Sequence, residues 1–314
     1  MKQIALSRLP ELLESLAARG SLYCPLDDLF FPQVEDLMRF RVSGKELEIL
    51  EAQVRQEPFV VFGVRACDCR ALEILDRVFL AEPEDSFYRD RREHGAVVSL
   101  ACQEPEETCF CGTFGIDAGN PAGDVSAWQW EDTLYFRANT EKGAALLAEL
   151  PLEEGGETAV EQAQGAARAI QDRLPLRGLT TEGFGRKEAM LELFHRPEWD
   201  RLSESCLGCG ACTFVCPTCQ CYDIKEFTGK EEVCRYRCWD SCMYSDFTLM
   251  SAGQPRPTQK ERFRQRFLHK LQYFPVNQDG VFGCVGCGRC LQRCPIHMNI
   301  VKVMKTLGGA PHES

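Results

Sequence analysis

The chain has 314 residues, enough for two domains that each bury a core of their own. Hydrophobic residues make up 44% of it and charged residues 26%, a profile that excludes wholesale disorder. The 36 basic residues against 47 acidic ones leave a formal net charge of −11, which argues against binding to nucleic acid or to anionic membranes.

The first twenty residues have a helical pattern. Leu9, Leu12 and Leu16 recur at helical spacing, and Glu11 interrupts the apolar run, so we expect a surface helix rather than a signal peptide. No stretch approaches the roughly 18 apolar residues that a membrane span requires. These features predict a cytoplasmic protein.

Two buried strands are predicted next, at residues 59–64 (FVVFGV) and from Ala96 (AVVSLAC), with a helical pattern at residues 70–80 between them. This order indicates a parallel βαβ unit. Cys67 and Cys102 follow the two strands, so they should emerge at the carboxyl edge of one sheet, where open α/β sheets usually bind ligands.

The rest of the chain predicts a hairpin, several helices and a change of domain at about residue 200, where cysteine, glycine and aromatic residues take over. The hairpin is expected at residues 126–138 and the helices at 141–150, 159–173 and 186–195. We therefore expect an N-terminal α/β domain at residues 1–200 and a mainly helical, ferredoxin-like dicluster domain at residues 201–314, an α+β/α/β architecture overall.

Cysteine is the unusual component of the sequence. Of the 19 cysteines, six lie in residues 1–205 and thirteen in residues 206–294. In a reducing compartment, so many clustered thiols indicate metal or cluster binding rather than a disulfide framework.

An internal repeat carries eight of these cysteines. CLGCGACTFVCP at residues 206–217 matches CVGCGRCLQRCP at residues 284–295, each with the pattern C-x-x-C-x-x-C-x-x-x-C-P. In two-cluster ferredoxins, three closely spaced thiolates bind one 4Fe-4S cluster and the fourth reaches the other. The predicted ligand sets are Cys206, Cys209, Cys212 with Cys294, and Cys284, Cys287, Cys290 with Cys216. The alternative is structural zinc, which usually takes two pairs of cysteines.

A third site is predicted in the N-terminal domain. Cys109 and Cys111 lie close to Cys102 in the sequence, and the βαβ argument brings Cys67 towards Cys102. These four residues would bind a third 4Fe-4S cluster, with zinc or free, partly buried thiols as the alternatives. Cys69 is a fifth thiol in this region.

The surplus cysteines have two interpretations. Cys234, Cys238 and Cys242 are four residues apart, so a helix would place them on one face, where with Cys219 and Cys221 they would bind another metal or form a redox-active dithiol. The simpler interpretation, which we favour, is a lining of free thiols beside the clusters. Cys24 is left over as well.

A basic stretch also has two interpretations. It would either act on charge, by offsetting the negative charge of the clusters or docking an acidic partner, or form a solvated helix face with Phe263, Phe267 and Leu271 turned inward. The helical spacing of these apolar residues favours the solvated face. The basic stretch comprises Lys260, Arg262, Arg264, Arg266, His269 and Lys270.

The motifs resemble a known family. CLGCGACTFVCPTCQCYDI, WDSCMYSDFTLMSAG and GCVGCGRCLQRCP are similar to the iron–sulfur electron-transfer protein shared by anaerobic sulfite reductase and nickel–iron sulfhydrogenase, in which it is the beta subunit. VRACDCRALEILDRVF and CFCG in the N-terminal half are similar too. The resemblance implies a ferredoxin-like subunit between a flavoprotein that oxidises NAD(P)H and a catalytic subunit of hydrogenase, sulfite reductase or heterodisulfide reductase type.

The sequence thus predicts an electron relay rather than a catalyst of bond chemistry. No G-x-G-x-x-G follows a strand and no P-loop motif occurs, so the chain shows no nucleotide site of its own. The competing hypotheses are a thiol–disulfide enzyme and a redox sensor, both of which would use the surplus cysteines.

Overall fold

The computed structural model describes residues 1–23, 29–50, 57–230 and 232–308. Cys24 lies outside these ranges. Within them, no helix combines the length and the apolar character needed to cross a bilayer.

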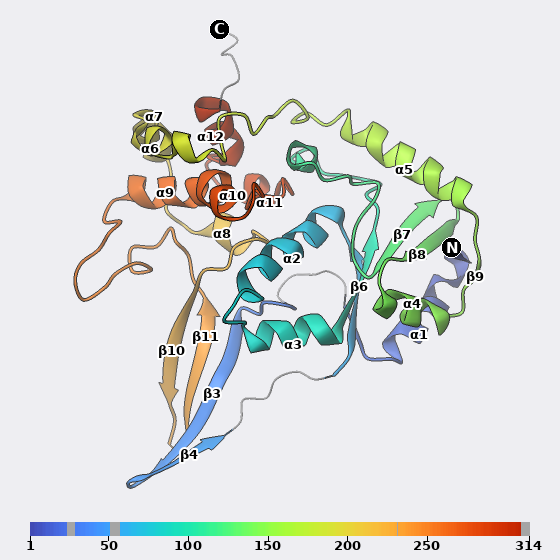
Figure 1. The fold of residues 1–314 in the computed structure, drawn as a ribbon, viewed down its shortest axis with the longest axis horizontal. Helices are drawn as coiled ribbons and strands as arrows, with labels where there is room; N and C mark the ends of the chain where they lie inside the picture. Colours follow the sequence, from blue (N-terminus) through green and yellow to red (C-terminus); the bar gives the residue numbers. More distant parts are fainter. Residues whose placement is uncertain (24–28, 51–56, 231, 309–314) are drawn as a thin grey trace.

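A seven-stranded mixed sheet forms the centre of the N-terminal half (Figure 1). β2, β5, β6 and β7 are parallel neighbours, and the sheet continues antiparallel beyond β7. In sheet order the strands are β2 (Ser21–Tyr23), β5 (Phe59–Val64), β6 (Gly95–Leu100), β7 (Val125–Trp130), β8 (Thr133–Ala138), β1 (Lys2–Ala5) and β9 (Glu153–Glu154). The apolar runs of β5 and β6 are buried because both faces of the sheet are covered.

Helices cover the two faces. The covering helices are α1 (Leu9–Ala17), α2 (Ala66–Phe79), α3 (Ser86–His94), α4 (Glu141–Ala148) and α5 (Glu157–Gln171). Val60 and Val98 share one hydrophobic core with Leu12 of α1 and Leu147 of α4. On the other face, Val61 and Val97 pack with α2 and α3, and Trp128 of β7 packs on α5. Residues 1–200 therefore contain a three-layer α/β/α sandwich.

Several predictions for this half are confirmed. β5 spans the predicted residues 59–64, and it pairs in parallel with β6 across α2, which is the predicted βαβ unit. β7 and β8 form the predicted hairpin. The N-terminal prediction is wrong in part, because Lys2–Ala5 form a strand of the sheet and the helix begins at Leu9.

A second, four-stranded antiparallel sheet projects from the body of the molecule (Figure 1). Its strands are, in order, β10 (Tyr222–Thr228), β11 (Val233–Trp239), β3 (Val34–Ser43) and β4 (Glu46–Leu50). It joins a hairpin from each half of the chain. The helix proposed for the spacing of Cys234, Cys238 and Cys242 is wrong, because Cys234 and Cys238 lie on β11 and Cys242 follows it.

Short helices around a separate hydrophobic core make up the rest of the C-terminal half. They are α6 (Met190–His195), α7 (Glu198–Glu204), α8 (Ala211–Phe214), α9 (Gln259–Leu268), α10 (Phe274–Asn277), α11 (Arg289–Gln292) and α12 (Ile300–Leu307). A π-helical turn, His269–Tyr273, joins α9 to α10. Cys206, Cys212, Cys284 and Cys290 pack against this core, so the cysteine repeats lie on its surface.

Candidate metal centre

The two cysteine repeats have the same backbone fold. In each, two glycines adopt positive φ before a one-turn helix, α8 or α11. The angles are 66° at Gly208 and 76° at Gly210, and 63° at Gly286 and 77° at Gly288. Left-handed turns of this kind turn backbone N–H groups towards sulfur, and Gly208 N lies 3.5 Å from Cys206 Sγ. The repeat seen in the sequence is therefore a structural repeat.

The second repeat forms what we call the inner group, Cys216, Cys284, Cys287 and Cys290. Burial, with Cys216 among the contributing charges, raises the pKa of Cys284 to about 11 and that of Cys287 to about 12. Burial also raises the pKa of Cys290, with Cys216, Cys284 and Cys287 as further causes. The thiol of Cys216, from the first repeat, therefore lies with the three thiols of the second, as the two-cluster pattern predicts.

The first repeat forms the outer group, Cys206, Cys209 and Cys212. Burial raises the pKa of Cys206, with Cys212 and Cys209 as its interacting thiols. Cys209 is exposed. Cys294, the predicted fourth member, donates a hydrogen bond from its thiol to the carbonyl of Met298 at 3.1 Å. Its assignment to the outer group stays a prediction.

The N-terminal group consists of Cys67, Cys102, Cys109 and Cys111. Burial raises the pKa of each, and their interactions link Cys67 to Cys111, Cys111 to Cys102, and Cys109 to both Cys111 and Cys102. Gln171 of α5 donates to Cys111 Sγ at 3.1 Å. The structure thus gathers the four thiols proposed for the third site.

The N-terminal group adjoins the inner group. Cys67 interacts with Cys287, and both pack in one hydrophobic cluster with Cys111. The loop carrying the N-terminal thiols is held by a backbone hydrogen bond from Phe110 N to Gly286 O at 2.8 Å. The two groups are therefore joined through both side chains and main chain.

An ion pair reinforces this junction. Arg289 of α11 donates to both carboxylate oxygens of Asp68 of α2, at 2.6 and 2.9 Å. Burial opposes the charged form of Arg289, yet the hydrogen bond to Asp68 raises its pKa above the usual value. Asp68 is only 4% exposed, so breaking the pair would strand a buried charge.

Two buried cations lie beside the inner group, and one of them also contacts the outer group. Arg266 is 1% and Lys270 4% exposed. The Arg266 guanidinium donates from Nε to Cys212 Sγ at 3.1 Å and also interacts with Cys216 and Cys290. Lys270 donates to Thr218 Oγ1 at 2.6 Å and to the carbonyl of Gly283 at 3.1 Å.

This burial corrects the interpretation of the basic stretch as a solvated helix face. Phe263, Phe267 and Leu271 are buried as expected, but so are Arg266 and Lys270, which face the thiols. The helix is enclosed on several sides. Arg266 and Lys270 are therefore placed where the alternative interpretation, an offset of cluster charge, needs them.

The donor set fits a pair of anionic iron–sulfur clusters. Arg266 Nη1 is buried and makes no hydrogen bond. A buried donor without a partner is costly, and the sulfide of a cluster would be an acceptor for it. Within the described ranges, no three His, Cys, Asp or Glu side chains are arranged around a single metal ion. In a four-iron cube each thiolate binds its own iron, so the thiols need not meet at one point.

Comparisons with known proteins find an iron–sulfur domain in the C-terminal half of the chain. Residues 205–298 match the family model of the 4Fe-4S dicluster domain. The chain is 34% identical over 284 residues to sulfhydrogenase 2 subunit beta of Pyrococcus furiosus, an alignment that covers 88% of this chain and 80% of that protein. The chain belongs to the sulfhydrogenase beta-subunit family. It is an iron–sulfur electron-transfer subunit. No solved structure matches the chain significantly.

The surplus cysteines of this family member lie in different places. Cys69 is buried and donates to the carbonyl of Ala122 at 3.2 Å, away from the N-terminal group. Cys234 contacts Asp36 and Arg39 on the four-stranded sheet. The structure does not bring Cys234 into the inner or outer group.

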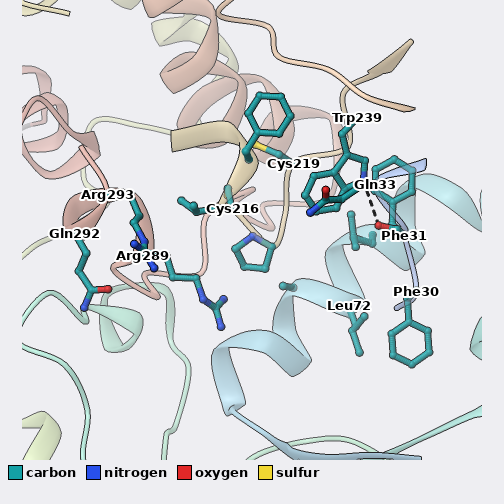
Figure 2. Close-up of a pocket in the computed structure, with 15 residues that line it drawn as sticks. Phe30, Phe31, Gln33, Leu72, Cys216, Cys219, Trp239, Arg289, Gln292 and Arg293 are labelled. Carbon is teal, nitrogen blue, oxygen red and sulfur yellow. Dashed lines mark hydrogen bonds between the residues drawn. The ribbon is translucent and has the colours of Figure 1, made fainter. Parts of the chain in front are cut away.

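Three other surplus cysteines lie beside the inner group. Cys219 contacts Cys216, and both line a cavity of about 510 Å³ whose other walls include Phe31 and Trp239 (Figure 2). Cys221 and Cys242 contact each other. The hydrogen bond from Cys242, together with the Cys242 backbone amide, lowers the pKa of Cys221 to about 7.

Several residues that contact the cysteine groups could not be identified from the cysteine spacing. Gln259 and Gln171 donate to cysteine sulfurs, at 3.3 Å to Cys206 and 3.1 Å to Cys111, from helices far away in the sequence. For Arg266 and Lys270, the sequence contained one indication of their position. They are four residues apart in a helix that is otherwise rich in buried aromatic side chains, so they share one face of it.

Proposed function

We propose that the chain relays single electrons through three 4Fe-4S clusters, held by the N-terminal, inner and outer groups in that order. Cys294 would complete the outer set. The observation that carries the proposal is the continuity of the three groups. Cys67 of the N-terminal group interacts with Cys287 of the inner group, and Arg266 interacts with thiols of both the inner and the outer group.

The clusters, when bound, supply one-electron redox chemistry, and the chain's own residues adjust their reduction potentials. Arg266 and Lys270 place two positive charges beside the inner group, which favours the more negative, reduced state there. Gln259 and Gln171 donate hydrogen bonds to sulfur at the outer and N-terminal groups. Hydrogen bonds to cluster sulfurs raise the reduction potential in the same way.

We further propose that the chain works between two partner proteins in the cytoplasm. One is a flavoprotein that oxidises NAD(P)H, and the other is a catalytic subunit of hydrogenase, sulfite reductase or heterodisulfide reductase type. The Pyrococcus furiosus relative is named as a beta subunit, which supports membership of a complex. The abundance of unpaired thiols supports a reducing compartment.

Iron and sulfide analysis of anaerobically purified protein tests the cluster number. Three clusters predict about twelve iron and about twelve acid-labile sulfide atoms per chain. Cys111→Ala should remove about four iron atoms, whereas Cys69→Ala, a neighbouring buried thiol outside the group, should remove none. About eight iron atoms in the wild type, unchanged by Cys111→Ala, would contradict the third cluster. About four or fewer would contradict the relay.

A further inference from the structure

The thiols of Cys221 and Cys242 form a pair that the relay does not use. Cys221 immediately precedes β10, and Cys242 follows β11, so the root of this hairpin brings them together. A backbone hydrogen bond from Asp240 N to Cys221 O, at 2.9 Å, fixes the two segments. The side chains contact each other. Two thiols in contact are placed to form a disulfide with each other.

The pair borders a cavity that is large enough for a small molecule. The cavity has a volume of about 300 Å³, and Arg256 contributes a positive charge to its lining. Cys221 is partly exposed and Cys242 is buried. Both thiols and Arg256 line the cavity, together with Tyr222, Phe247 and His269. An accessible thiol backed by a buried one is the arrangement that thiol–disulfide exchange requires.

The pair also lies next to the inner group. Lys270 acts electrostatically on Cys221, Cys242, Cys216 and Cys219, which places both pairs of thiols around one buried ammonium group. Electrons at the inner group are therefore close to the Cys221–Cys242 pair.

We propose that Cys221 and Cys242 are a redox-active dithiol that reduces small anionic disulfides entering this cavity, with electrons drawn from the inner iron–sulfur site. The electron supply rests on the function proposed above. The exchange chemistry rests on the thiol pair and its cavity alone.

The reaction balances in two stages. Cys221 attacks one sulfur of the substrate disulfide, the S–S bond breaks, and the first thiol leaves. Cys242 then attacks the mixed disulfide at Cys221, which releases the second thiol and forms the Cys221–Cys242 disulfide. Two electrons, supplied one at a time from reduced clusters, and two protons from water restore the dithiol. The sum is one disulfide, two electrons and two protons converted to two thiols.

The first experiment traps the exchange on the iron-loaded protein. Anaerobic protein is treated with dithiodiglycolate, a small dianionic disulfide, and analysed by mass spectrometry. The wild type should yield a Cys221–Cys242 cross-linked peptide and no lasting adduct. Cys242→Ser should accumulate a mixed disulfide at Cys221, and Cys234→Ser, which removes a partly exposed thiol on the four-stranded sheet, should behave as the wild type. Adducts spread over other cysteines, or a wild type without the cross-link, would overturn the proposal.

Charge selectivity tests the cavity. In the Cys242→Ser background, Arg256→Gln should slow adduct formation with dithiodiglycolate on the order of tenfold, because it removes the positive charge. The rate with cystamine, a dicationic disulfide, should not fall. Equal slowing with both reagents would mean that Arg256 acts on the fold, and would overturn the assignment of the cavity as the substrate site.

Electron supply is read by EPR spectroscopy. Protein reduced with dithionite and freed of excess reductant is mixed with dithiodiglycolate. The reduced-cluster signal should decay in the wild type and in Cys234→Ser, and persist in Cys221→Ser and Cys242→Ser. Decay in all four would overturn the proposal. If the relay itself were wrong, the reduced protein would show no cluster signal from the start, whereas the cross-link would still form.

Discussion

The two cysteine repeats share a backbone fold but differ in what packs against them. A Cβ on Gly208 or Gly210 of the first repeat would meet the side chains of Gln259 and Tyr244, at 2.8 and 2.7 Å. A Cβ on Gly286 or Gly288 of the second would meet main-chain atoms, the carbonyl oxygens of Phe110 and Thr108, both at 2.5 Å. The outer repeat therefore lies under adjustable side chains, and the inner repeat lies against fixed backbone of the N-terminal half.

One position of the repeat adds to this difference between the two copies. Between the second and third cysteines, the inner repeat has Arg289, which pairs with the buried Asp68, whereas the outer repeat has Ala211 at the same position. The outer group includes the exposed Cys209. One repeat thus joins the two halves of the protein, and the other faces solvent. The same cluster-binding motif serves as an internal junction in one copy and as a surface in the other.

The largest difference should appear when each repeat loses a cysteine. Cys290→Ala and Cys209→Ala should each remove about four iron atoms per chain. Cys290→Ala should also lower Tm much further, because the inner group supports the N-terminal loop as well as its own helices. Iron analysis and thermal unfolding under anaerobic conditions measure both effects. Equal losses of Tm would mean that the repeats are equivalent, contrary to the comparison.

Next in size is the ion pair at the junction. Asp68→Asn leaves the partly buried Arg289 without its counter-charge and should destabilise the protein by about 2–3 kcal/mol, or several degrees in Tm. Glu73→Gln on the same helix removes an exposed partner of Arg70 and should cost less than about 1 kcal/mol. Thermal unfolding compares the two variants. A loss for Asp68→Asn no greater than that for Glu73→Gln would show that the pair does not hold the halves together.

Alanine substitutions at matching glycines of the two repeats should differ by a smaller amount in stability. Gly208→Ala and Gly286→Ala carry the same backbone strain, about 1 kcal/mol, since both residues have positive φ. Gln259 can move away from the new methyl group, but the carbonyl of Phe110 cannot, so Gly286→Ala should cost about 2 kcal/mol more. Gly286→Ala should also release iron from the N-terminal group. Tm and iron content check these outcomes, and a reversed order would contradict the packing described for the two repeats.

The smallest effect should come from Arg266, the buried cation that contacts both the inner and the outer group. Arg266→Gln removes a cation beside both groups and should lower their reduction potentials by about 40–90 mV, equivalent to about 1–2 kcal/mol per electron. Lys260→Gln makes the same change of charge at a more exposed position of α9 and should shift them far less. Redox titration followed by EPR measures the shift. If only one cluster responds, Arg266 belongs to that group alone.

Parts of the fold and of the cysteine groups were predictable from the sequence. The two C-x-x-C-x-x-C-x-x-x-C-P runs identify the repeats, because the ligand spacing is local. The βαβ unit followed from short apolar runs on either side of a helical pattern, since buried parallel strands are apolar throughout. Adjacent parallel strands then brought Cys67 towards Cys102 at the carboxyl edge of the sheet. In each case neighbouring residues carried enough information.

The remainder depended on distant contacts. Arg266 and Lys270 have the spacing of an ordinary amphipathic helix, and only the tertiary packing shows that they are buried beside thiols. The pairing of β3 with β11 joins residues about two hundred positions apart, so the helical spacing of Cys234 and Cys238 was misleading. Local propensity is weak for short segments, and strand pairing overrode it here.

The pairing of β3 with β11 also affects how the gene can be divided. A cut at residue 200 would separate Val34–Ser43 from Val233–Trp239, so that each fragment would expose an unpaired strand edge. The buried ion pair between Arg237 and Glu35 would be broken by the same cut. Two fragments produced together would therefore be expected to reassociate, whereas either one alone would tend to aggregate.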